Sequence, residues 1–158
     1  MEVRQIPMAQ LRGIIDEQLA HGEALLPVTG NSMWPLLVGG RDMVRLARPD
    51  RCTQSGDIAL YQKADGSYIL HRVIRLCAPE TCICCGDAQW EGEQVDEAQI
   101  IAYVTAFRRK GHWQETALSR PYRLYEHFWV HTFPARRPLL RLLRFLQRAR
   151  RGLIRGRR

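Results

Sequence analysis

The stretch Val28-Thr29-Gly30-Asn31-Ser32-Met33-Trp34-Pro35 decides how the rest of the chain is interpreted. It follows a short apolar run and places a serine between a glycine and a proline. Gly30 can adopt backbone angles that other residues resist, and Pro35 biases Trp34 towards an extended conformation. The stretch therefore predicts a sharp bend with an accessible Ser32 hydroxyl. Ser32 is either a turn residue whose hydroxyl bonds to its own backbone or a nucleophile.

Turn signals divide the chain on either side of this bend into short segments. Apolar residues at three- and four-residue steps predict a helix over residues 8–21, with Gly22 as its stop. Short strands separated by turn residues are expected at 25–28, 43–46, 58–63, 68–76, 82–85 and 100–107. Four acidic residues are expected in an exposed loop: Glu91, Glu93, Asp96 and Glu97. The pattern predicts a mainly β fold, either a bent sheet or a partial barrel, with an N-terminal helix.

Length and charge indicate a single domain with a basic C-terminal tail. The chain of 158 residues suits one domain with one core. Ten of its 24 Lys and Arg lie in residues 136–158, which contain no Asp or Glu, so 14 basic side chains face 16 acidic ones elsewhere. The basic signal therefore belongs to a tail. No run of about 18 apolar residues predicts a transmembrane helix, and residues 1–5 lack a secretory signal, so the cytoplasm is the default expectation.

The tail has its own pattern. Helix-like spacing begins at Ser119, which divides the chain into a β domain (1–118) and a helical, arginine-rich extension (119–158). On a helix, one face collects Leu139, Leu142, Leu143 and Leu146, flanked by Leu140 and Phe145, opposite Arg141, Arg144 and Arg148. Such a pattern is typical of a peripheral helix on the cytoplasmic side of an anionic membrane. A helix packed on the domain, with its arginines in solvent, is an equally good interpretation of this pattern. Binding of nucleic acid is a weaker one, because aromatic residues are not interleaved with the arginines.

Five cysteines are present: Cys52, Cys77, Cys82, Cys84 and Cys85. An odd number without an export signal indicates reduced thiols. The cluster at 82–85 lacks the second pair of ligands that structural zinc sites use. We therefore expect buried strand cysteines here, and the sequence implies neither a metal nor a cofactor.

Three residues combine into a candidate catalytic site: Ser32, His71 and Asp87. Serine needs a base within hydrogen-bond reach, and histidine, with an ordinary pKa of about 6.5, is mostly neutral at pH 7. A carboxylate on the far ring nitrogen fixes the tautomer and stabilises the imidazolium. Both residues also have a purely structural interpretation. His71 would be a strand histidine bonded to a neighbouring backbone, and Asp87 would be a turn aspartate after Gly86.

The local motifs are more specific than the residue types. Residues 30–35 (GNSMWP) resemble the G-x-S-M-x-P box of the signal peptidase and LexA-type serine peptidase superfamily. Residues 56–60 (GDIAL) are similar to its G-D-[IV]-V strand start, and residues 70–74 (LHRVI) resemble the H-R-[VI] segment of the branch that uses histidine. Residues 85–89 (CGDAQ) are similar to its later G-D box. The boxes occur in the family's order over residues 25–110.

The resemblance implies a LexA/signal-peptidase-like fold and a serine endopeptidase that cleaves a leader or signal-like peptide. Ser32 would be the nucleophile, His71 its base and Asp87 the group that orients His71, with Glu91 or Glu93 as alternatives for this third role. The substrate would be an extended peptide or protein segment lying as an added strand. Two other functions stay open: a non-catalytic peptide-binding module, and a tether to membrane or nucleic acid through the tail.

Overall fold

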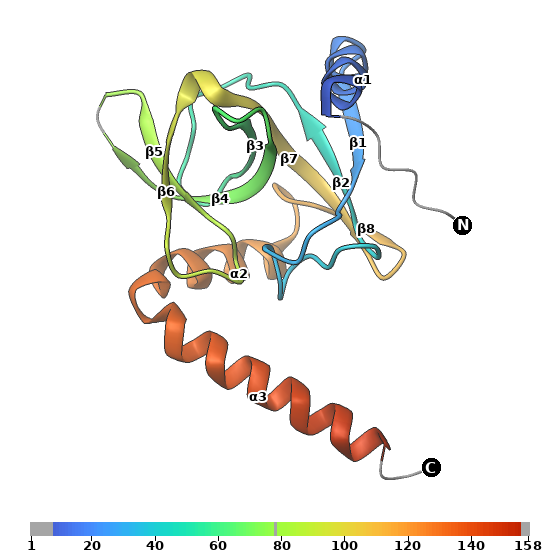
Figure 1. The fold of residues 1–158 in the computed structure, drawn as a ribbon, viewed down its shortest axis with the longest axis vertical. Helices are drawn as coiled ribbons and strands as arrows, with labels where there is room; N and C mark the ends of the chain where they lie inside the picture. The colour runs from blue at the N-terminus through green and yellow to red at the C-terminus, as the bar shows by residue number, and fades with distance from the viewer. Residues whose placement is uncertain (1–7, 78, 156–158) are drawn as a thin grey trace.

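The computed structural model describes residues 8–77 and 79–155, and within them it is mainly an antiparallel sheet of eight strands with helices at both ends (Figure 1). The N-terminal helix is α1 (Met8–Ala20). The strands are β1 (Glu23–Pro27), β2 (Met43–Ala47), β3 (Ile58–Gln62), β4 (Tyr68–Cys77), β5 (Thr81–Cys85), β6 (Glu93–Asp96), β7 (Ile100–Arg109) and β8 (His112–Glu115). The C-terminal helices are α2 (Arg120–His131) and α3 (Arg136–Arg155).

The sheet runs in the order β1-β2-β7-β3-β4-β5-β6, and β8 pairs with β7. Its strands curve strongly in Figure 1. Side chains alternate between the two faces of each strand, and two buried apolar clusters result. One contains Ile15 of α1 and Phe107 of β7, and the other contains Tyr61, Val73 and Cys84. The hairpin of β3 and β4 pairs Tyr61 with Ile69 and residue 59 with residue 71.

Most expected elements are confirmed, and two differences have clear causes. The prediction of an exposed acidic loop was wrong. Residues 93–96 form β6 against β5, and residues 97–99 form a 3-10 turn. Val95 is the reason, since it is 2% exposed and belongs to the second apolar cluster. The sequence also missed β8, whose four side chains are all exposed and so give no alternating signal.

The C-terminal helices are attached to the sheet by a few buried side chains. The Ser119 hydroxyl accepts a hydrogen bond from Tyr122 N and so caps α2. Tyr122 joins the first apolar cluster, while Arg136 and Leu140 at the start of α3 are fully buried. Leu140 therefore packs on the body of the protein, and the rest of α3 extends away from it (Figure 1). None of the helices in the described ranges is long and apolar enough to span a bilayer.

The cysteine cluster lies in the sheet. Cys82, Cys84 and Cys85 are fully buried in and at the end of β5, which confirms the expectation of buried strand cysteines. The Sγ atoms of Cys82 and Cys84 are 3.6 Å apart. All five cysteines carry free thiols.

Candidate active site

The Ser32 bend lies between β1 and β2 and is anchored by its neighbours. Trp34 N donates to Asn31 O at 3.1 Å, and Leu37 N donates to Met33 O at 2.9 Å. Met33 and Leu37 are buried in the first apolar cluster, so the bend cannot move independently of the core. Ser32 itself is half-buried and lines a cavity of about 730 Å³.

Of the two backbone polar groups of Ser32, the carbonyl oxygen accepts a hydrogen bond within the described structure and the N–H donates none. Its carbonyl oxygen accepts a hydrogen bond from Ala88 N at 2.7 Å, which holds the bend against the segment after β5. The hydrogen bonds of the described residues include none from the Ser32 N–H. This N–H can therefore donate to a carbonyl oxygen of a bound substrate, as an oxyanion donor does.

His71 lines the same cavity from β4, and a chain of polar groups lies behind its ring. Its Nδ1 is 3.1 Å from Tyr61 Oη and 3.7 Å from Glu93 Oε1. Tyr61 Oη donates to the same Glu93 carboxylate, whose other oxygen lies 2.7 Å from Lys63 Nζ. Lys63, Glu93, Tyr61 and His71 thus form a connected chain from the protein surface to the imidazole.

The protons in this chain determine the tautomer of His71. Burial raises the pKa of Tyr61, and Glu93 raises it further, so the phenol keeps its proton. Burial also pushes the pKa of Glu93 upward, but hydrogen bonds from Lys63 and Tyr61 outweigh burial and lower it, so the carboxylate is ionised. Because the single phenol proton goes to Glu93, Tyr61 Oη can only accept from His71, and Nδ1 carries the ring proton.

His71 Nε2 is consequently left with its lone pair. Burial lowers the pKa of His71, although the carboxylates of Glu93 and Asp87 oppose this effect, so the ring is neutral at pH 7. A neutral ring with an unprotonated Nε2 is the form that a general base requires.

The surroundings of Gly86 show that Nε2 lies close to the Ser32 bend. A β-carbon at this position would lie 2.6 Å from Ser32 O and 3.1 Å from His71 Nε2. The imidazole and the Ser32 backbone therefore both lie close to Gly86, and they leave no room for a side chain at this position. The described residues show no hydrogen bond from Ser32 Oγ to His71. Catalytic hydrogen bonds are often long in unliganded enzymes and tighten when substrate binds.

Asp87 occupies a different place from the one expected. Its buried carboxylate accepts from Arg72 Nε and Nη2, both at 2.8 Å, and from Tyr125 Oη at 3.0 Å. Arg72 directly follows His71 in β4, so the two side chains point to opposite faces of the strand. No hydrogen bond joins Asp87 to His71 among the described residues, and Asp87 stabilises Arg72 instead of orienting the imidazole.

The other two carboxylates considered from the sequence also separate. Glu91 is exposed and lines the cavity, but no hydrogen bond or ion pair links its carboxylate to His71 in the described part of the chain. Glu93 is the carboxylate that approaches the ring. Tyr61 and Lys63 were not foreseen. The Asp65-Gly66 hairpin could have identified Tyr61, because its register puts Tyr61 and His71 on one face, diagonally across the two strands.

Ala88 forms part of the cavity wall, and the C-terminal helices hold the segment 86–88 that contains it in place. Gly86 O accepts from Arg136 Nη1 at 3.3 Å. The carbonyl of residue 87 accepts from Trp129 Nε1 at 3.2 Å, and the carbonyl of residue 88 accepts from Arg144 Nη2 at 3.1 Å. Residues 119–144 therefore support the wall that contacts Ser32.

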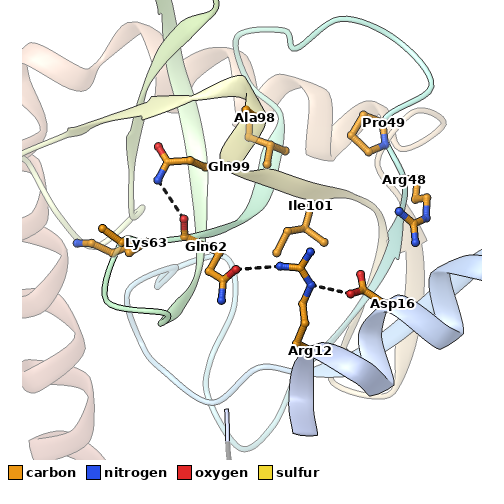
Figure 2. A pocket seen from close by; sticks show the side chains of 11 residues that line it. Arg12, Asp16, Arg48, Pro49, Gln62, Lys63, Ala98, Gln99 and Ile101 are labelled. Carbon is orange, nitrogen blue, oxygen red and sulfur yellow. Dashed lines mark hydrogen bonds and ion pairs between the residues drawn. The ribbon is translucent and has the colours of Figure 1, made fainter. Parts of the chain in front are cut away.

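A second cavity, of about 480 Å³, lies beside α1 and contains none of the predicted catalytic residues (Figure 2). Arg12 Nε donates to Asp16 at 2.6 Å, and Arg12 Nη1 donates to Gln62 Oε1 at 2.8 Å. Gln99 Nε2 donates to Gln62 O at 3.0 Å. These bonds join α1 to the end of β3, and the end of β3 to the 3-10 turn before β7, which is a structural role.

Comparison with known proteins gives no assignment. The chain matches no protein-family model and no curated protein. Within residues 8–77 and 79–155, no three His, Cys, Asp or Glu side chains lie close enough together to hold a metal ion. The geometry around Ser32 and His71 therefore has to carry any functional assignment.

Proposed function

We propose that this chain is a serine endopeptidase of the signal peptidase type, with Ser32 as nucleophile and His71 as general base. The observation that carries the proposal is the position of the imidazole beside the Ser32 bend. Tyr61 and Glu93 hold the proton on Nδ1, and Nε2 lies close to the Ser32 bend, beside Gly86. Glu93, rather than Asp87, takes the role of the third residue.

The reaction proceeds in two steps. Ser32 Oγ attacks a peptide carbonyl while His71 Nε2 accepts its proton, and the Ser32 N–H donates to the oxyanion. His71 then returns the proton to the leaving amine, and an acyl-enzyme ester remains. Water, deprotonated by His71, hydrolyses this ester and regenerates the hydroxyl of Ser32. The negative charge of Glu93, transmitted through Tyr61, stabilises the imidazolium in both steps.

The cavity geometry and the resemblance of the motifs favour an extended peptide as substrate. Ser32 and His71 lie at one open cavity of about 730 Å³, large enough for several side chains of a bound segment. We include the LexA/signal-peptidase-like fold and the cleavage of a leader or signal-like segment in the same proposal. Both come from the resemblance of residues 30–35, 56–60, 70–74 and 85–89.

Peptide cleavage tests the proposal directly. The full-length protein is incubated with a proteome-derived peptide library, and new termini are identified by mass spectrometry. We expect wild type to generate a defined set of products, and Ser32→Ala and His71→Ala to lower their formation by at least about 10³-fold. Ser67→Ala and His112→Ala are matched controls, since both residues lie outside the cavity, and they should cleave as wild type.

The same experiment separates the enzyme from a binding module. A module without catalysis would retain peptides but release no products. Its binding would not change in Ser32→Ala or His71→Ala. Products formed equally by wild type and Ser32→Ala would also overturn the proposal.

A further inference from the structure

The longest helix, α3, carries an apolar side that the rest of the described structure leaves uncovered. Leu142, Phe145 and Leu146 are 55%, 67% and 53% exposed. At 3.6 residues per turn they lie on one side of the helix, next to the half-buried Leu139 and Leu143. Exposed apolar side chains gathered in this way mark an interaction site more often than scattered ones do.

The opposite side of α3 faces the body of the protein. The Arg137 guanidinium lies 5.6 Å from the centre of the Trp90 ring, and Arg144 Nη2 donates to Ala88 O. Helix geometry puts Arg141 and Arg148 between this side and Phe145. The apolar side therefore points away from the body, from which α3 extends in Figure 1.

The charge of the segment decides between the possible occupants. Residues 136–158 contain ten arginines and no acidic residue. Two copies of α3 packed through their apolar sides would bring like charges together with no acid in the segment to offset them. A nucleic acid would bind the arginines but leave the leucines and Phe145 uncovered. An anionic lipid surface accommodates both the apolar side chains and the arginines.

We propose that α3 lies in the plane of an anionic membrane. Leu142, Phe145 and Leu146 enter the acyl region, and the exposed Arg141 and Arg148, next to Phe145 on the helix, contact lipid phosphates. Leu142, Phe145 and Leu146 do not line the cavity, although Arg144 of the same helix does, and the proposed binding requires no peptidase activity. Ser32→Ala is expected to bind membranes as wild type does.

Vesicle co-sedimentation of the full-length protein tests the inference. Vesicles contain phosphatidylcholine alone or phosphatidylcholine and phosphatidylglycerol in equal parts. We expect binding to the mixed vesicles that weakens with added salt, and much weaker binding to phosphatidylcholine alone. The triple variant Leu142→Ser/Phe145→Ser/Leu146→Ser should lower the partition coefficient by at least about 10-fold. Because these side chains are exposed, the variant should keep its fold, which circular dichroism verifies.

The matched control replaces two apolar residues outside α3. Leu118 and Leu124 are 78% and 72% exposed, and Leu118→Ser/Leu124→Ser should bind as wild type. Equal binding by the α3 variant, or no binding to mixed vesicles, overturns the inference. So does a dimer in sedimentation velocity that the α3 variant dissociates, because the apolar side then contacts a second copy. Binding to duplex DNA without binding to lipid overturns it as well.

Discussion

Asp87→Ala is expected to destabilise the fold strongly. The Asp87 carboxylate is fully buried and neutralises the guanidinium of Arg72, which is also fully buried. Without the carboxylate, that guanidinium keeps only neutral partners, Gly56 O at 2.9 Å and Tyr122 Oη at 3.1 Å. Tyr125 loses the acceptor of its hydroxyl as well.

The expected cost follows from this burial. Removing one partner of a buried ion pair costs about 3–5 kcal/mol, whereas a domain is stable by only about 5–15 kcal/mol. Urea unfolding followed by tryptophan fluorescence measures the change. Asp16→Ala is the matched control, because Asp16 pairs with Arg12 at 2.6 Å on the surface, where the loss is about 0–1 kcal/mol.

A double variant separates the effect of an unpaired buried charge from the effect of losing side-chain volume. Arg72→Met/Asp87→Leu removes both charges, and it should recover most of the stability lost in Asp87→Ala, since apolar residues often replace buried pairs without loss. If Asp87→Ala is no less stable than Asp16→Ala, Asp87 is not the structural partner of Arg72, and its separation from His71 has to be reconsidered.

Two further predictions concern the cavity. Because burial lowers the pKa of His71, the acid limb of the cleavage rate should have its midpoint below pH 6.5, with activity lost as His71 becomes protonated. Glu93→Gln removes a charge that raises this pKa, so the midpoint should move further down, and an unchanged midpoint would argue against the chain through Tyr61. Gly86→Ala should slow cleavage by at least about 10-fold, because the new β-carbon meets Ser32 O at 2.6 Å, whereas Gly13→Ala, with no atom within 4 Å, should not. Equal rates in both variants would contradict the proposed approach of Ser32 and His71 beside Gly86.

The sheet could be predicted because turn-forming residues separate most of its strands in the sequence. Asp65-Gly66 and Gly86-Asp87 mark the ends of β3, β4 and β5 unambiguously. β6 could not be recognised, because Glu93-Gln94-Val95-Asp96 contains a single apolar residue that packs in the core. Such a strand depends on pairing with β5 for stability, and its own four residues carry no alternating apolar signal.

The candidate site could be predicted only in part, for a related reason. Motifs place Ser32 and His71 in the chain, but they do not state which face of a strand a distant carboxylate meets. Asp87 meets Arg72, and Glu93 meets the face of His71 because β6 pairs it with Cys84. Only the register of β4, β5 and β6 distinguishes the two acids.

The tautomer of His71 tests the central claim most directly, and it needs no substrate. Two-bond ¹⁵N–¹H correlation spectra of the imidazole identify the protonated ring nitrogen at neutral pH. The structure requires the proton on Nδ1, donated to Tyr61 Oη, and an unprotonated Nε2 towards Ser32. Tyr61→Phe should weaken this preference. If Nε2 carries the proton in the wild-type protein, His71 cannot accept one from Ser32, and the proposed mechanism is contradicted.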